Sequence, residues 1–144
     1  MTPDVNVLVA ASREDHPHHP VTLAWLERAI AESDTTSPLA ILPMVASGFL
    51  RLVTHPRVFV EPTPLADAQA FLDAILTAPN VIMPLLGEEW SRMSTLCADR
   101  QLTGNAIPDA WIAAAAQHHN LHLVTLDKGF RKLLKASRVT VLKA

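Results

Sequence analysis

Short apolar runs that alternate with amphipathic helical segments constrain the fold of this chain more than any other feature of its sequence. Each run has about the length of a buried strand and is bounded by proline, asparagine or a charged residue. Strands that alternate with helices predict a parallel sheet covered by helices on both faces. The four runs are PLAILP (38–43), NVIMPLL (80–86), LHLVTL (121–126) and RVTVL (138–142).

Apolar residues recur at helical spacing between these runs, as Val21, Trp25 and Ala29 do in the first helical segment. Proline content marks EDHPHHP (14–20) and THPRVFVEPTP (54–64) as loops. The predicted helices comprise residues 20–32, 43–53, 65–76, 87–99 and 105–118.

The composition is that of a globular chain, with 49% hydrophobic and 18% charged residues. Its 144 residues suit one domain, 1–144, with a single core. The apolar runs are too short to span a bilayer, so no membrane association is expected. The N-terminal residues lack the basic region of a secretory signal, and the single cysteine, Cys97, permits no internal disulfide. We therefore expect a cytoplasmic protein.

The net charge of −2 indicates no class of partner, but the distribution of charge is uneven. Half of the 12 basic residues follow Asp127, with no acid among them. They could form a surface that faces phosphates, or only a solvated helix face.

Two acids stand at the ends of predicted elements where ligands commonly bind. Asp127 directly follows the run LHLVTL, and ligands of open parallel sheets bind at the carboxyl ends of strands. Asp109 lies in the first turn of an alanine-rich helix, where the helix dipole alone would explain an acid. Asn105, four residues earlier, could cap this helix or share a face with Asp109.

The N-terminal segment admits two interpretations. The residues VNVLVAA could form a strand with Asp4 at its start, on the edge of the sheet opposite Asp127. Alternatively, TPDV is a very short strand that ends at Asp4 and leads into a helix. Periodicity does not decide between them.

Four motifs in order resemble the PIN domain, and specifically the VapC toxins of toxin–antitoxin systems. They are MTPDVNVLVAA, GFLRLVTHPRVF, GNAIPDAWIAAAA and LVTLDKGF, and the likeness runs from Pro3 to about Leu134. The resemblance implies a three-layer α/β/α sandwich around a mostly parallel sheet of about five strands, with a short first strand that ends in an acid. It also implies that Asp4, Asp109 and Asp127 correspond to three acids of the family's metal site and serve as catalytic residues.

One position departs from the family pattern. PIN domains usually carry a glutamate on the helix after the second strand, and Gly48 stands there in this chain. No Asp or Glu occurs between Asp34 and Glu61, so a shift of the alignment supplies no substitute. A second metal position and a full catalytic rate are therefore in doubt.

The resemblance implies a metal-dependent endoribonuclease that acts on RNA as a toxin, forms a homodimer and pairs with a VapB-like antitoxin. A site of carboxylates without thiolate or imidazole favours Mg²⁺ or Mn²⁺ over zinc. Because Gly48 lacks a carboxylate, a catalytically weakened domain that binds RNA or its antitoxin is an alternative. A dehalogenase-like phosphatase is a further one, but that chemistry needs a second acid where this chain has Asn6.

Overall fold

The computed structural model describes residues 1–143 and begins with a short strand that ends before the first acid. Strand β1 (Thr2–Pro3) is followed by helix α1 (Val5–Ser12), and Asp4 is the N-cap between them. Its backbone is extended, and its carboxylate accepts a hydrogen bond from the Val5 amide, which satisfies one of the free donors of the first helical turn. Of the two interpretations of the N-terminus, the short strand is therefore the correct one.

Five short parallel strands form the centre of the molecule. They are β1, β2 (Leu39–Ala40), β3 (Val81–Ile82), β4 (Leu123–Thr125) and β5 (Val139–Val141). Strand β4 pairs with β1 and with β5, and β2 pairs with β3. The Ala40 amide also donates to the carbonyl of Met1, and the Thr2 hydroxyl donates to the carbonyl of Ala40. The three-stranded sheet β1-β4-β5 and the two-stranded sheet β2-β3 thus lie side by side in the order β3-β2-β1-β4-β5, in agreement with the predicted parallel sheet.

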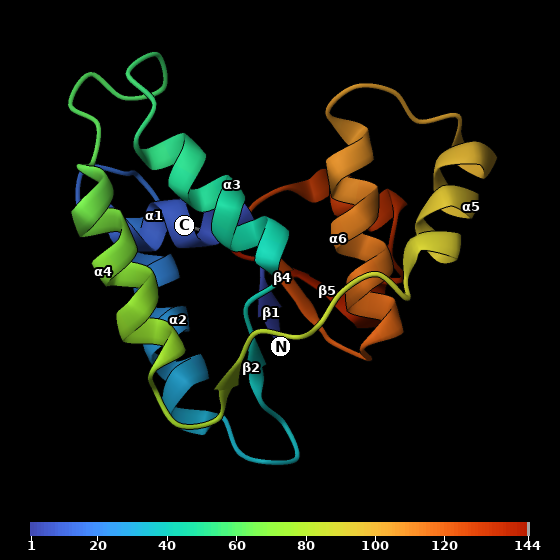
Figure 1. Ribbon diagram of the computed structural model, residues 1–144, viewed down its shortest axis with the longest axis horizontal. Coiled ribbons are helices and arrows are strands. Elements are labelled where there is room, and N and C mark those ends of the chain that lie inside the picture. Colours follow the sequence, from blue (N-terminus) through green and yellow to red (C-terminus); the bar gives the residue numbers. More distant parts are fainter. Residues whose placement is uncertain (144) are drawn as a thin grey trace.

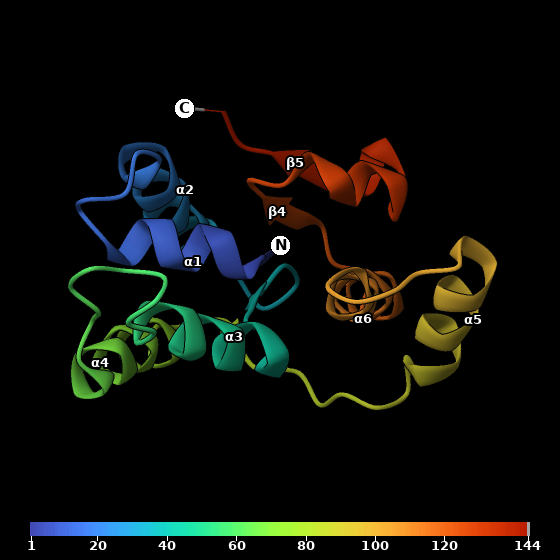
Figure 2. The ribbon, with the colours of Figure 1, turned by 90° about the horizontal axis from the view of Figure 1, so that it is seen from above.

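Helices cover the sheet on both sides, as the three-layer prediction requires. Figure 1 shows α1 to α4 on one side of the strands and α5 and α6 on the other. Figure 2, seen from above, also places α3 and α6 facing each other. The helices that follow α1 are α2 (His19–Glu32), α3 (Pro43–Val53), α4 (Leu65–Leu76), α5 (Trp90–Arg100) and α6 (Ala106–His118).

The alanines of α6 bring this helix close to the rest of the core. Ala110, Ala113, Ala114 and Ala116 are fully buried. Their small side chains allow close approach of the helix backbone, which positions the first turn of α6 at the carboxyl ends of the strands. Ala113 and Ala116 belong to the core cluster that also contains Leu8, Phe49 and Leu123.

The strands are shorter than the apolar runs that predicted them. The run NVIMPLL was expected to be buried, but only Val81 and Ile82 are in a strand, and Leu85 is 93% exposed. Two causes act together: β3 lies at the edge of the sheet, and Pro84 has no amide hydrogen with which to continue pairing. The chain leaves β4 through a 3₁₀ helix, η1 (Lys128–Lys132), and a second one, η2 (Ala136–Arg138), precedes β5.

The long loop 54–64 is tied to the body of the protein by a buried arginine. Arg13 makes a bidentate ion pair with Asp15 and donates to the hydroxyl of Thr63. Its guanidinium also lies 3.8 Å from the ring centroid of Phe59. All three guanidinium nitrogens therefore donate hydrogen bonds, and the group also packs on an aromatic ring. No helix within residues 1–143 combines the length and apolarity needed to cross a bilayer.

Helices α1 and α3 pack so closely that only glycine fits at one contact. A Cβ atom on Gly48 would lie 2.9 Å from Cγ2 of Val5. Valine is branched at Cβ and has few alternative rotamers, so it cannot easily move away.

We predict that Gly48→Ala destabilises the protein, because overpacking costs about 1–3 kcal/mol and exceeds the helix-propensity gain of about 0.5–1 kcal/mol. In a Val5→Ala background the same substitution should stabilise, because the contact is gone and only the propensity gain remains. Urea denaturation of the four proteins in this double-mutant cycle measures the coupling. Equal effects of Gly48→Ala in both backgrounds would contradict the packing argument.

Candidate active site

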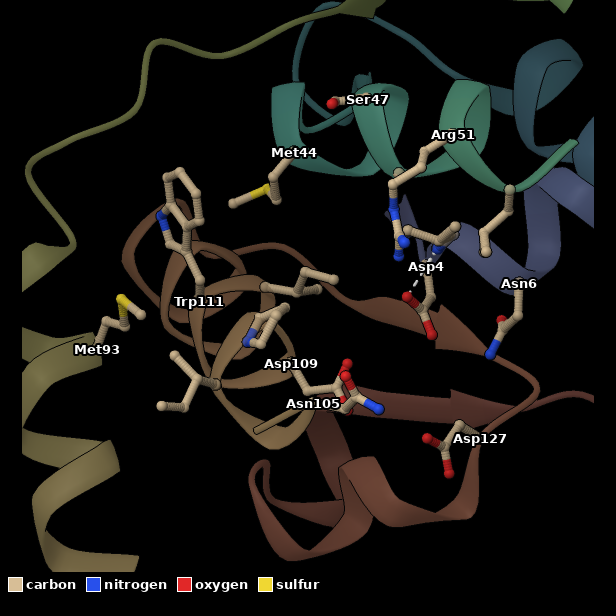
Figure 3. Close-up of a pocket in the computed structure, with 16 residues that line it drawn as sticks. Asp4, Asn6, Met44, Ser47, Arg51, Met93, Asn105, Asp109, Trp111 and Asp127 are labelled. Atoms are coloured by element: carbon tan, nitrogen blue, oxygen red, sulfur yellow. Dashed lines mark hydrogen bonds between the residues drawn. The ribbon is translucent and has the colours of Figure 1, made fainter. Parts of the chain in front are cut away.

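A cavity of about 550 Å³ opens where β1 and β4 end, between α3 and α6. It brings together all three predicted acids, although they come from distant parts of the chain (Figure 3). One part of its wall is polar and the other part is apolar. The lining residues used below are Asp4, Val5, Asn6, Met44, Gly48, Arg51, Asn105, Ile107, Asp109, Trp111 and Asp127.

Asp4 is the most buried of the three acids, with 5% of its surface exposed. One carboxylate oxygen accepts from the Val5 amide at 2.7 Å, and the other accepts from the Thr125 hydroxyl at 2.7 Å. Burial raises the pKa of Asp4; the hydrogen bonds from Thr125 and Val5 oppose this rise, and the charge of Asp127 adds to it. The carboxylate is therefore held in one orientation in a setting that favours a bound cation.

Thr125 connects the first and last parts of the site, and sequence reasoning missed it. Besides donating to Asp4, its hydroxyl accepts from the amide of Asp127 at 2.9 Å and from the side chain of Asn6 at 3.3 Å. Asn6 in turn accepts from the Leu126 amide. The sequence signal was a hydroxyl residue two positions before the acid that ends an otherwise apolar strand.

Asp127 is held by the start of η1. Its carboxylate accepts from the Gly129 amide at 2.7 Å, and a Cβ on residue 129 would lie 3.0 Å from the same oxygen. A glycine therefore lets the chain turn tightly around the acid. The side chain remains exposed and faces the space shared with the other two acids (Figure 3).

Asp109 reaches the same space from the first turn of α6. Burial, together with the charges of Asp4 and Asp127, raises the pKa of Asp109 to about 6. Stabilisation by the helix dipole would lower this pKa, so burial and the two neighbouring charges outweigh it. Asn105 precedes the helix without a side-chain capping bond, and it lines the cavity with Asp109. Of the two roles considered for Asn105, the shared face is the one observed.

The donor set of this cavity is made of oxygen atoms. Carboxylates and the amides of Asn6 and Asn105 line it, and no Cys or His side chain does so within the described residues. No three His, Cys, Asp or Glu side chains within residues 1–143 lie close enough together to hold one metal ion between them. This arrangement fits a hard, hydrated ion such as Mg²⁺, which keeps several waters and uses one or two carboxylates.

The apolar wall is anchored by a buried carboxylate. The indole N–H of Trp111 donates to Glu89 at 2.8 Å, and the Gly87 amide donates to the same carboxylate. Burial alone would raise the pKa of Glu89, but these hydrogen bonds outweigh it and hold the pKa below its usual value. Glu89 thus fixes the segment before α5 to α6. Trp111 stays 36% exposed at the cavity, beside Met44 and Ile107.

Comparison with known proteins shows the family to which the chain belongs. The family model described as the PIN domain matches residues 1–135. The chain is 36% identical to "Ribonuclease VapC25" of Mycobacterium tuberculosis over 137 residues, covering 94% of each chain. It is 41% identical to "VapC ribonuclease Mb2897" of Mycobacterium bovis over 130 residues, covering 90% of this chain and 86% of that protein.

A solved structure shares the fold. The crystal structure of VapBC2 from Rickettsia felis bound to a DNA fragment from their promoter superimposes with a TM-score of 0.61 at 21% identity, covering 92% of this chain and 91% of that chain. The fold and the matched family model define a PIN domain. The chain belongs to the PIN-domain family, in its VapC branch, as its motifs predicted.

The raised pKa of Asp109 predicts a pH-dependent stability in the absence of divalent ions. The folded-state pKa of about 6 exceeds the unfolded value of about 3.9. At Asp109 the folded protein therefore binds more protons than the unfolded chain between about pH 4 and 6, so the contribution of this residue to the free energy of unfolding falls as the pH rises through this window. Asp109→Asn should make the decline shallower. Urea denaturation in EDTA checks this, and parallel curves for both proteins would refute it.

We predict that the Thr125 hydroxyl contributes substantially to the free energy of unfolding. Thr125→Val keeps the shape but leaves the buried Asp4 carboxylate without one donor, at an expected loss of about 1–3 kcal/mol of stability at neutral pH. Thr125→Ser keeps the hydroxyl and should lose much less. Chemical denaturation of the three proteins compares these losses. A valine variant as stable as the parent would show that the hydrogen bond contributes nothing.

Proposed function

We propose that this protein is a metal-dependent endoribonuclease that hydrolyses RNA phosphodiester bonds as the toxin of a toxin–antitoxin pair. The observation that carries the proposal is the meeting of Asp4, Asp109 and Asp127 in one cavity, where their mutual repulsion helps to raise the pKa of Asp109. Relatives that share 36% and 41% identity with nearly the whole chain are named ribonucleases.

Each acid has a role that its surroundings support. Asp4 and Asp109 would hold the ion, because both are partly or wholly withdrawn from water and their charges repel each other. Asp127 is the most exposed of the three and would complete the site or orient the attacking water. Thr125 would act as a positioning residue, since its hydroxyl orients Asp4 and contacts the Asp127 amide.

The proposed cofactor is Mg²⁺ or Mn²⁺. When bound, such an ion polarises a phosphoryl oxygen, lowers the pKa of a water and stabilises charge on the leaving oxygen. The oxygen-only donor set supports these ions rather than zinc.

The surface beside the site supports a polyanionic substrate. Lys128, Arg131 and Lys132 of η1 are exposed and directly follow Asp127. Contacts from these residues to flanking phosphates would make RNA binding sensitive to salt and would carry little sequence information. Arg138, by contrast, is engaged with the side chain of Asn120.

We infer three further properties from membership in the VapC branch. The protein forms a homodimer, binds a VapB-like antitoxin and acts in the cytoplasm, where its RNA substrate is found. The weakened-domain alternative rests on Gly48 alone, and the ribonuclease names of the relatives favour an active enzyme.

Substitution of the acids should separate chemistry from folding. Asp4→Asn and Asp109→Asn keep the shape of each side chain but remove a charge that the ion needs, so we predict that Mg²⁺-dependent cleavage is lost in both. Purified total RNA serves as the substrate, and sequencing of the new RNA ends locates the cuts.

Asp73→Asn is the matched control, because Asp73 is exposed on α4 and does not line the cavity. It should cleave like the parent, and circular dichroism should show all three variants folded. Undiminished cleavage by folded Asp4→Asn or Asp109→Asn would overturn the assignment of the site.

A further inference from the structure

Among the described residues that line the acidic cavity, Arg51 is the only one with a cationic side chain. It belongs to α3, on the wall opposite α6, one helical turn after Gly48. Figure 3 shows its guanidinium directed toward Asp4. The residues of α3 that line the cavity are Met44, Ser47, Gly48, Arg51 and Leu52, and Arg51 is the charged one among them.

The guanidinium of Arg51 is not used to hold the fold together. Within residues 1–143, ion pairs closer than 4.0 Å join only Arg13 to Asp15 and His118 to Glu88. Arg13 shows what a structural arginine looks like here: it is buried, bidentate and stacked on Phe59. Arg51 is exposed and has no comparable partner in the described part of the chain, so its N–H donors are free to bind a ligand.

Charge balance indicates what that ligand is. Three carboxylates, one divalent ion and one RNA phosphodiester would leave two excess negative charges in the cavity, and Arg51 lowers the excess to one. The guanidinium presents a planar fork of N–H donors that matches the geometry of two phosphate oxygens. A metal ion held by carboxylates offers no such pair of hydrogen-bond donors. A positive group placed there would favour entry of the phosphate into an otherwise repulsive site.

We propose that Arg51 is a phosphate-binding residue of this active site, donating its guanidinium N–H groups to the non-bridging oxygens of the RNA phosphodiester. This inference rests on the proposed ribonuclease function and adds to it a residue outside the three acids. If Arg51 instead only neutralised the acids when no ion is bound, its substitution would change ion binding and leave the cleavage rate at saturating Mg²⁺ unchanged.

The test compares Arg51→Gln and Arg51→Lys with the parent. The substrate is a short RNA oligonucleotide that spans a cut mapped in total RNA. Removal of one preorganised donor from a reacting oxyanion typically slows catalysis by about 10²–10³-fold, so we expect a loss of this size for Arg51→Gln in single-turnover cleavage at saturating Mg²⁺. Arg51→Lys should recover part of the rate, because it keeps the charge but not the fork.

Binding of Mn²⁺, followed by electron paramagnetic resonance without RNA, distinguishes phosphate binding from a role in holding the ion. The affinity should stay unchanged or increase in Arg51→Gln, because a positive charge near the acids has been removed. Millimolar guanidinium ion should partly restore cleavage by Arg51→Ala, which a purely structural role does not predict. Arg28→Gln is the matched control: Arg28 is exposed on α2, lies outside the cavity, and its loss should leave the cleavage rate unchanged.

The outcomes are separable. If the parent protein cleaves no RNA with Mg²⁺ or Mn²⁺, the proposed function fails. If the parent cleaves and folded Arg51→Gln cleaves within about twofold of it, only the role of Arg51 is overturned. A fall in Mn²⁺ affinity that matches the fall in rate would also overturn it, because Arg51 would then act through the ion. If Arg51→Gln does not fold, Arg51→Lys and the guanidinium rescue decide.

Discussion

The pairing of β1 with β4 is the contact on which the site depends. It sets the register in which Pro3 lies opposite Val124, so the two strands end at the same end of the sheet. Asp4 and Asp127 follow shortly after these strand ends. The Thr125 hydroxyl then bridges the two strand ends, with Asp4 as its acceptor and the Asp127 amide as its donor. Residues more than 120 positions apart become neighbours because two very short strands end together.

The third acid, Asp109, is positioned by helix packing and not by strand pairing. Within the described residues, no backbone hydrogen bond joins helix α6 to a strand. The position of the helix depends on the burial of its alanines. Small side chains bring the helix axis close to the sheet, and the first turn then carries Asp109 into the charged space. The cost is visible in its pKa, which burial and the two neighbouring carboxylates raise together. A bound cation would remove the repulsive part of this cost, so ion binding and stability are expected to be coupled.

Periodicity and strand-end arguments predicted much of this arrangement from sequence. The five predicted helices are present, and Asp127 lies at the expected edge of the sheet. The place of Asp4 depended on the length of β1, which local composition could not decide, because VNVLVAA suits a strand or a helix equally. The exposure of Leu85 was missed, since apolar content does not reveal that β3 is an edge strand. Thr125 was missed because a single hydroxyl in an apolar run has no periodic signal.

The site also contains a residue pattern that no single position reveals. Arg51 and Gly48 share one face of α3. Gly48 has no side chain and so allows the close contact with Val5, whereas Arg51 brings a positive charge to the cavity. Both were visible in the sequence, but their relation to the acids required the crossing of α3 over α1.

The contact between Gly48 and Val5 has a consequence for how this site can change over generations. An acidic side chain at position 48 would project from a backbone that Val5 already crowds. If Val5 were first replaced by a smaller residue, a larger residue at position 48 could then be accommodated. In the reverse order, the new side chain at position 48 would clash with Val5. We therefore expect the two positions to be epistatic, and the gain of a fourth carboxylate at position 48 to follow a substitution at position 5.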